Sequence, residues 1–242
     1  MKTKLFTLAL AALTIGLLGS CKKDNGPETP KIPEGALSGE FSVSATKKVY
    51  FSKGNLYADG SNALHFEANQ YSTASSWNAS HVSHFTWSST VEAAVGNNNS
   101  GDNLFCDESH KVSVDGGEAI YYALSRDEWT YLFNNHSKKW TKVNGLSGYV
   151  IAPDGFEGNL ANSYANDAEL VTAGNLVFLP AAGYRRSSDV SLVGGNGYYW
   201  SSTAFDSVST YYLYFDSDGA YPNDGYTTRN DGYSVRLVTE VK

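Results

Sequence analysis

The chain has few cysteines and few charged residues. Only two of its 242 residues are cysteines, Cys21 and Cys106, so it can build neither a disulfide framework nor a zinc site made of several cysteines. Charged residues make up 18% of the chain, the net charge is -7, and no long run of Lys or Arg occurs. Surfaces that bind nucleic acid carry a basic patch, so we expect no nucleic-acid partner.

A second absence is local. From Ala204 to Arg236 there is no Lys, Glu, Gln, Met or Trp. Eight of the chain's 17 tyrosines lie between Tyr198 and Tyr233, among Asp, Asn, Ser, Thr and Gly. Tyrosine offers a large contact area at a low rotamer cost, and small polar residues adapt their hydrogen bonds, a combination typical of binding surfaces. The composition therefore predicts a ligand-binding face within residues 198–236.

The N-terminal segment has the pattern of a targeting signal. Lys2 and Lys4 precede an apolar run, Leu5–Leu18, that is too short for a transmembrane helix, so we expect residues 1–20 to be a signal peptide. The run ends in Leu18-Gly19-Ser20-Cys21, which resembles a bacterial lipobox. This resemblance implies a lipid on Cys21 and an outer-membrane protein anchored through it, at the cell surface. The alternative is an ordinary secretory signal cleaved near the same place.

A tether is expected between this signal and the folded domain. Lys22–Ser38 holds three of the six prolines and shows no apolar periodicity, which is typical of extended, solvated chain. We therefore predict a tether over residues 21–38 and a domain over residues 39–242. If Cys21 carries a lipid, Cys106 has no disulfide partner and is expected to be a small buried side chain.

The first half of the domain predicts strands followed by loops. Alternating apolar residues over Gly39–Gln70 predict an antiparallel sheet. Tyr71–Asp115 is rich in Ser, Asn and Gly, so we expect long loops there, anchored by Trp77 and Trp87. His81 and His84 lie in this stretch and lack a third ligand at metal-binding spacing, so we expect surface histidines rather than a metal pair.

One helix is strongly marked. Ser125-Arg126-Asp127-Glu128 has the pattern of a capping box, in which the first and last side chains each bond the other's backbone amide. Trp129, Leu132 and Phe133 follow at the spacing of a buried helical face. Gly148–Ala152 and Leu176–Leu179 predict buried strands, and Ala161–Ala173 a weaker helix. Together with 23 glycines and 14% aromatic residues, these patterns favour an α+β fold of small antiparallel sheets, one or two short helices and long loops.

The two-residue period returns near the C-terminus. Leu213 and Phe215 fall on one face of a strand, and Tyr212, Tyr214, Asp216 and Asp218 fall on the other. The apolar pair is expected to face the core, which turns the tyrosines and aspartates outward. Val235 and Leu237 alternate with Ser234 and Arg236 in a predicted closing strand, and Asp218–Asp231 predicts a polar loop between the two.

Five motifs together resemble the formylglycine-generating enzymes and the Fibrobacter major paralogous domain. They are, in the family's order, YYALSRDEWTYLF (Tyr121–Phe133), GYVIAPDGF (Gly148–Phe156), LVFLPAAGYR (Leu176–Arg185), GYYWSST (Gly197–Thr203) and YSVRLV (Tyr233–Val238). The resemblance implies a C-type-lectin-like fold. FSVSATKKVYFSKGNL (Phe41–Leu56) also resembles lipoproteins of gut Bacteroidales.

Leu179–Val238 is more specifically similar to the variable protein of a diversity-generating retroelement. In that family a reverse transcriptase copies a template with errors at adenines, mostly in Asn codons of type AAC or AAT. Replacing those adenines gives Tyr, Asp, Ser, Thr, Gly, Ala, Val and Phe, among others, but never Lys, Glu, Gln, Met or Trp. The same residue types are absent from Ala204 to Arg236.

The likeness divides Thr210–Arg229 into two sets of positions. The family's framework matches at Leu213, Phe215, Ser217, Pro222, Asn223 and Arg229. The departures, which we call the variable positions, are Tyr212, Tyr214, Asp216, Asp218, Gly219, Tyr221, Asp224, Gly225, Tyr226, Thr227 and Thr228.

From composition and resemblance together we expect a surface lipoprotein whose C-terminal face binds an unknown protein or glycan. The expected ligand-binding residues are Tyr212, Tyr214, Asp216, Asp218, Tyr221, Asp224, Tyr226, Thr227, Thr228, Asp231 and Tyr233. Trp200 and Arg236 are expected to hold the frame instead.

Catalysis and metal binding are not expected. The formylglycine-type oxidation needs a pair of cysteines in the C-terminal part of the domain, where this chain has none, so we expect no enzyme. The calcium triplet of C-type lectins is replaced by Tyr221-Pro222-Asn223, which lacks its first ligand, so we expect no cofactor. Asp216, Asp218, Asp224 and Asp231 leave calcium possible through another geometry.

Two other functions fit the same fold. One is a structural or adhesion subunit of a surface assembly whose face is not diversified, and the other is a glycan-binding accessory protein. A reverse-transcriptase gene and a near-copy of the 3′ end of this gene would favour diversification. Saturable binding of one polysaccharide that survives loss of the tyrosines would favour the glycan accessory.

Overall fold

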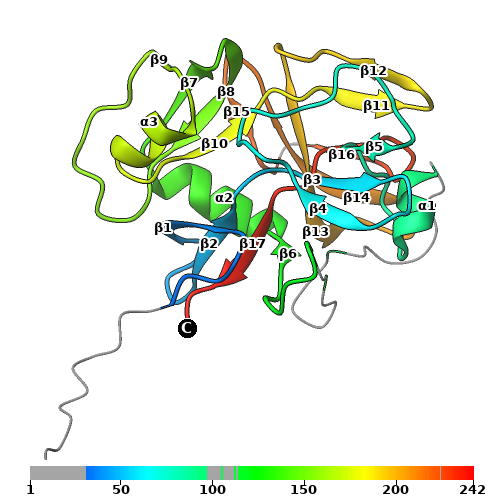
Figure 1. Cartoon of the computed structure of the whole chain (residues 1–242), viewed down its shortest axis with the longest axis horizontal. Helices are drawn as coiled ribbons and strands as arrows, with labels where there is room; N and C mark the ends of the chain where they lie inside the picture. Colours follow the sequence, from blue (N-terminus) through cyan, green and yellow to red (C-terminus); the bar gives the residue numbers. More distant parts are fainter. Residues whose placement is uncertain (1–30, 97–104, 106–111, 113, 224) are drawn as a thin grey trace, which may run out of the picture. The chain divides into compact units, whose positions relative to one another are not determined.

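The first two strands of the domain share a sheet with the last one (Figure 1). The computed structural model describes residues 31–96, 105, 112, 114–223 and 225–242, so Cys21, Cys106 and Asp224 lie outside the described residues. The sheet that joins the two ends has the order β1 (Ala36–Ser42), β2 (Lys48–Ser52), β17 (Leu237–Glu240), β6 (Tyr122–Ala123). Because β17 lies between β2 and β6, residues far apart in sequence share one antiparallel sheet.

Two further four-stranded sheets make up most of the rest. The first has the order β10 (Val177–Pro180), β8 (Leu146–Ile151), β7 (Lys138–Val143), β9 (Ser163–Tyr164), in which only the pair of β7 with β9 is parallel. In the second, β14 (Ser209–Phe215) pairs with β13 (Gly197–Ala204) on one side and with β15 (Ala220–Tyr221) and β16 (Tyr226–Thr228) on the other.

The remaining elements are small. β4 (Leu64–Phe66), β3 (Leu56–Asp59) and β5 (His81–Val82) form a three-stranded sheet, and β11 (Tyr184–Arg186) and β12 (Asp189–Ser191) form a hairpin. The helices are α1 (Val91–Val95), α2 (Arg126–Asn135) and α3 (Asp167–Thr172). Small antiparallel or mixed sheets with a few short helices confirm the α+β class. Among the described residues no helix has the length and apolar character needed to cross a membrane.

The strongly marked helix forms as predicted. Ser125 caps α2, its Oγ accepts from the amide of Glu128 at 3.2 Å, and Oε2 of Glu128 accepts from the amide of Ser125 at 2.8 Å. Trp129, Leu132 and Phe133 are buried, as the spacing predicted. α2 therefore packs its aromatic face into the core, where it contacts β13 and β14.

The sheet of β13 and β14 has a core on each face. Tyr199, Leu213 and Phe215 face the cluster that contains Trp129 and Phe133 of α2. Trp200 and Tyr233 face a second cluster, built around Phe85 and Trp87. Both faces of this sheet are thus packed at one end, and the region around Tyr212 and Tyr214 opens toward solvent on one face.

A buried polar network ties the closing segment to this frame. Arg236 is 1% exposed and donates from Nη2 to Gln70 Oε1 at 2.9 Å. Gln70 Oε1 also accepts from the amide of Phe178, and the Tyr199 hydroxyl donates to the carbonyl of Pro180 at 2.9 Å. Burial lowers the pKa of Arg236 to about 10, so it stays charged at neutral pH. The prediction that Trp200 and Arg236 hold the frame is confirmed by their burial.

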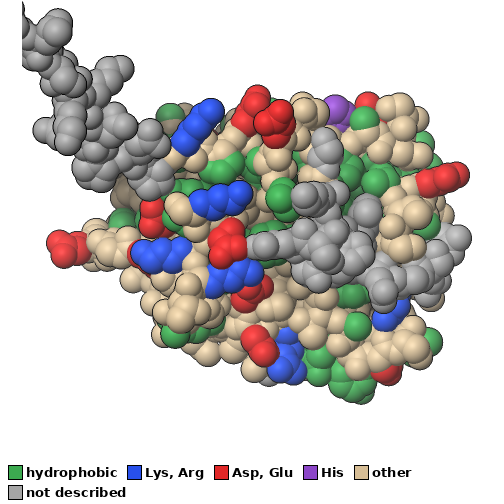
Figure 2. All heavy atoms as spheres, turned by 90° about the horizontal axis from the view of Figure 1, so that it is seen from below, with side chains coloured by type: hydrophobic (Ala, Val, Ile, Leu, Met, Phe, Trp, Pro, Cys, Tyr) green, Lys and Arg blue, Asp and Glu red, His purple; other side chains and the backbone are tan. Residues whose placement is uncertain are grey.

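Charged side chains of both signs intermingle on the face seen from below in the orientation of Figure 1 (Figure 2). Near β1 and β2, Lys48 Nζ lies 2.9 Å from Asp154 Oδ2, and Lys47 Nζ lies 2.9 Å from Glu128 Oε1. In these two pairs a neighbouring carboxylate offsets the charge of each lysine.

Several local expectations were wrong. Ala36–Ser38, placed in the tether, belong to β1, because the strand extends to pair Ala36 with Ser52. The weaker helix is only α3, which begins at Asp167, where Asn166 caps it. Trp77 is 42% exposed and is therefore not a buried anchor, whereas Trp87 is buried as predicted.

The C-terminal segment also departs from its prediction. Ser234 and Arg236 are as buried as Val235 and Leu237, because the closing segment has packed structure on both sides. The polar loop expected over Asp218–Asp231 contains β15 and β16, which extend the sheet of β14.

His84 gives the frame a pH dependence. It is 2% exposed, its Nε2 lies 2.9 Å from the Ala182 carbonyl oxygen, and burial lowers its pKa to about 4. The expectation of a surface histidine is therefore wrong here. The unfolded chain takes up this proton near pH 6.5, so the neutral histidine stabilises fully above that pH and this contribution is lost as pH falls toward 4.

We expect urea-induced unfolding to become easier between pH 6.5 and 4, with a slope from His84 of at most about 1.4 kcal/mol per pH unit. The variant His84→Gln keeps a donor for Ala182 and should lose this slope. The pKa of His65 is raised chiefly by its hydrogen bond to Asp115, so its contribution to the free energy of unfolding grows as pH falls. This contribution is the same in both proteins and cancels when their slopes are compared. Equal slopes in the two proteins would contradict the role of His84.

Candidate ligand-binding face

β14 separates the predicted scaffold residues from the predicted surface residues. Leu213 and Phe215 are 0% exposed, while Tyr212 and Tyr214 on the opposite face are partly exposed. The outward orientation predicted for the two tyrosines is confirmed. Gly197 pairs with Phe215, whose ring lies so close that a Cβ on Gly197 would stand 2.1 Å from it. Only glycine fits at that point of β13.

The tyrosines form a row that leads out of the second core. Trp200 and Tyr233 are buried, with ring centroids 4.3 Å apart. Tyr212 contacts Tyr233 at 5.1 Å, and Tyr198 lies 5.2 Å from Tyr214. Each ring rests on a more deeply buried one, so the outer tyrosines are held in place before any ligand arrives.

The outer end of this row borders an open pocket of about 270 Å³. Its lining residues are Tyr212, Tyr214, Asp216, Asp218, Tyr221 and Gly225. The rings of Tyr214 and Tyr221, which are paired across β14 and β15, are stacked with centroids 5.7 Å apart and planes 18° apart. A Cβ on Gly225 would stand 2.7 Å from the Tyr212 hydroxyl, so the backbone there closes directly over that ring.

Asp216 holds the turn at the edge of the pocket. Its Oδ1 accepts from the amides of Asp218 and Gly219 at 2.8 and 3.2 Å, and its Oδ2 accepts from the Tyr214 hydroxyl. The bond from Tyr214, supported by the two amides, lowers the pKa of Asp216 and raises that of Tyr214 to about 12. The carboxylate is therefore charged and fixed in position, and the phenol is neutral, at physiological pH.

Two predicted binding residues are instead internal. Tyr233 is 4% exposed because it lies beneath Tyr212 and beside Trp200, and burial raises its pKa. Asp231 is 6% exposed because its two carboxylate oxygens accept from Nε and Nη2 of Arg186 at 2.9 and 3.0 Å. Both support the pocket from within, and their side chains expose little surface to a ligand.

The remaining predicted residues divide between the two faces of the sheet. In β16, Tyr226 pairs with Tyr211, and Thr227 with Thr210. Residues paired directly across antiparallel strands point to the same side. Thr227 therefore lies on the pocket side, where its hydroxyl is 3.5 Å from Asp231 Oδ2, and Tyr226 and Thr228 lie on the other side.

Tyr226 belongs to a second aromatic cluster that the sequence analysis missed. Its ring stacks on Phe205 at 4.1 Å, and Phe205 meets Tyr211 edge-on at 5.4 Å. Phe205 is 44% and Tyr226 59% exposed, and the Arg126 guanidinium lies 4.8 Å from the Tyr211 ring centroid. The sequence signal was present in Phe205 and Val208, two exposed apolar residues inside the tyrosine-rich stretch.

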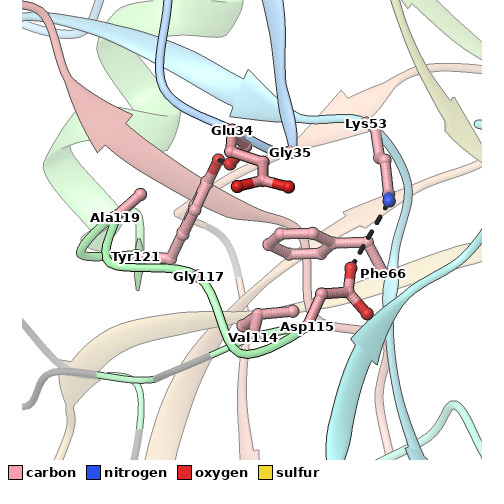
Figure 3. Close-up of a pocket in the computed structure, with 9 residues that line it drawn as sticks. All are labelled: Glu34, Gly35, Lys53, Phe66, Val114, Asp115, Gly117, Ala119 and Tyr121. Atoms are coloured by element: carbon pink, nitrogen blue, oxygen red, sulfur yellow. Dashed lines mark hydrogen bonds and ion pairs between the residues drawn. The ribbon is translucent and has the colours of Figure 1, made fainter.

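A smaller hollow of about 90 Å³ lies between Gly35, Phe66 and Tyr121 (Figure 3). Two interactions already occupy polar groups around it: Lys53 Nζ lies 3.4 Å from Asp115 Oδ2, and the Tyr121 hydroxyl donates to the carbonyl of Glu34 at 2.7 Å. The open pocket beside Tyr212, Tyr214 and Tyr221 is larger, and both aromatic rings and carboxylates line it.

Within the described residues, no three His, Cys, Asp or Glu side chains lie where they could share a metal ion. Asp224, one of the four aspartates considered for calcium, lies outside those residues. His81 and His84 do not come together as a metal pair, because Nε2 of His81 lies 2.7 Å from Glu67 Oε1 and His84 is in the core.

Residues 161–238 match a family described as a domain of unknown function, DUF8237. The match covers less than half of the chain and includes every residue that lines the open pocket. Comparison with curated proteins and with solved structures gave no match.

Burial separates the two sets of positions found in the sequence. None of the ten variable positions that the structure describes is buried. Four of the six framework positions are buried: Leu213, Phe215, Pro222 and Arg229. The framework positions are mostly those that hold the fold, and the described variable positions lie at the surface or are partly exposed.

This separation predicts that a substitution at a buried framework position lowers the free energy of unfolding more than one at a variable position. Leu213→Ala leaves a cavity in the core and should lower the free energy of unfolding by about 2–5 kcal/mol. Tyr221→Ser, in which a half-exposed ring on the short edge strand β15 is lost, should cost less than about 1 kcal/mol. Urea titrations of both variants beside the unchanged protein measure the difference. Similar losses in the two would contradict the division into scaffold and surface.

Proposed function

We propose that this chain is a surface lipoprotein whose C-terminal face binds a ligand and is diversified by adenine-directed retroelement mutagenesis. The observation that carries the proposal is that burial follows the family pattern: framework positions are mostly buried and the described variable positions are not. A mutagenesis that changes only exposed side chains alters binding while it leaves the core intact.

The residue types on this face support binding rather than catalysis. The pocket is lined by three tyrosines, two aspartates and a glycine, with the rings supported from below by Tyr233 and Trp200. Tyrosine rings in preset positions bury contact area at a low cost in entropy, and aromatic residues often carry most of the binding energy of an interface. The chain thus needs no cofactor for this role.

The finer fold and the location belong to the same proposal. The C-type-lectin-like likeness rests on the five motifs, whose residues contribute to α2, β8, β10, β13 and β17. The lipid anchor rests on the lipobox-like ending at Cys21. A lipid there, followed by Pro-containing chain, would attach the domain to the outer membrane with room for the face to meet a partner.

The gene provides a direct test of diversification. We expect a near-copy of the segment that encodes Thr210–Arg229 close to a reverse-transcriptase gene, with differences only where the copy has adenine. Genomic sequencing of the locus checks this. Differences spread over all four bases, or the absence of any copy, would leave a surface assembly subunit as the better function.

Binding is tested with the purified full-length chain against arrays of cell-surface proteins and glycans. The triple variant Tyr212→Ala, Tyr214→Ala, Tyr221→Ala should lose any ligand found, because aromatic anchors typically cost more than about 2 kcal/mol when truncated. Phe205→Ala with Tyr226→Ala probes the opposite face of the sheet separately.

The matched control is Trp77→Ala with Tyr131→Ala, which removes aromatic surface from other parts of the domain. Thermal melting confirms that all variants fold. If the triple variant binds as well as the control, the pocket is not the binding site. A single polysaccharide that binds regardless of the tyrosines would favour the glycan accessory.

A further inference from the structure

The pocket combines aromatic rings with negative charge and has no cation of its own. Three of its six lining residues are tyrosines and two are aspartates, and none is Lys, Arg or His. The face of an aromatic ring carries partial negative charge, which attracts cations placed over it. A pocket of this composition therefore favours a positively charged group over a neutral or negative one.

Elsewhere in the same chain, tyrosine rings contact the charged groups of Lys and Arg side chains. Among the described residues, Lys47 lies 4.6 Å from the ring centroid of Tyr122, Arg126 lies 4.8 Å from that of Tyr211, and Arg186 lies 5.3 Å from that of Tyr184. Within that part of the chain no Lys or Arg lies over Tyr212, Tyr214 or Tyr221. The pocket rings thus lack the intramolecular cation that three other tyrosines have.

The carboxylates are placed to complete the site. Asp216 is fixed by the Tyr214 hydroxyl and by two backbone amides, and Asp218 follows it in the same turn. A cation that enters over Tyr214 and Tyr221 would meet a charge held in position, so little ordering is needed on binding. An apolar ligand without hydrogen-bond donors would instead remove water from these carboxylates without replacing the lost interactions.

We propose that the pocket binds a lysine or arginine side chain presented by a protein partner. The proposal rests on the proposed function of the face and names the chemistry of its ligand in this variant. The open shape of the pocket favours a side chain on a larger surface over a small free amine, because neighbouring parts of the face can then contribute contacts. The net charge of -7 acts in the same direction by attracting basic partners.

The test uses the full-length chain and five short peptides, Ac-Gly-Ser-Xaa-Ser-Gly-NH2, with Xaa as Lys, Arg, norleucine, citrulline or Glu. Norleucine and citrulline retain much of the shape of lysine and arginine without the charge. We expect the Lys and Arg peptides to bind about three- to tenfold more tightly than their neutral counterparts, and more weakly at high salt. Titration followed by NMR of the tyrosine rings measures the affinities and shows which rings are involved.

Asp216→Asn with Asp218→Asn should remove this preference. An Asn at position 216 still offers an amide oxygen to the two backbone N–H groups, so the turn can be retained. Asp218→Asn alone is the second variant if the double variant melts at a lower temperature. The matched control is Glu157→Gln with Asp189→Asn, which removes two exposed negative charges that do not line the pocket.

Equal affinity for the lysine and norleucine peptides, no saturable binding of any peptide, or an unchanged preference in the aspartate variants would each overturn the proposal. Failure of the cation assignment can be distinguished from failure of the proposal that this face binds a ligand. If a natural ligand is lost on changing Tyr212, Tyr214 and Tyr221 but not on changing the two aspartates, the face binds a ligand and the cation assignment is wrong.

Discussion

The packing of Phe215 fixes the strand on which the whole face depends. Its ring lies across Gly197 and contacts Trp140, Tyr149 and Tyr199, with centroids 5.4 to 6.2 Å apart. A strand that slips by one residue turns every side chain to the opposite face. For β14 that slip would bury the tyrosines and expose Leu213 and Phe215, so the aromatic packing also determines which residues a ligand can reach.

The aromatic rings of the binding face are held in position because they pack directly on rings of the hydrophobic core. Tyr212 rests on Tyr233, which rests on Trp200, whose Nε1 donates to the carbonyl of Phe85 at 2.6 Å. Protein interiors are close-packed, so each buried ring in this row restricts the position of the next ring toward the surface. Side chains at the rim can then differ between variants while the rings beneath them keep the backbone in place.

Local patterns predicted the parts of the fold that depend on neighbours in sequence. The capping box at Ser125 and the alternation over Tyr212–Phe215 were both right, because they involve residues two to four positions apart. The errors concern long-range pairing. Tyr226 is on the far face only because it pairs with Tyr211, and Asp231 is internal only because Arg186 reaches it.

The structure also restricts which residues a variable position can hold. Asp216 accepts from two amides of its own turn, so only residues with a short side-chain acceptor, such as Asp, Asn, Ser or Thr, can keep those bonds. These four residues are all within reach of adenine replacement in an Asn codon, so the proposed mutagenesis can preserve the turn at this position.

Tyr212 and Gly225 are coupled to each other. The backbone of Gly225 lies against the Tyr212 hydroxyl, and any side chain at position 225 would meet it at 2.7 Å. A larger residue at 225 therefore requires the loop to move or a smaller residue at 212. If both positions vary, the combinations that fold are fewer than the product of the two sets, so steric pairing across the pocket limits the repertoire of the face in addition to the genetic code.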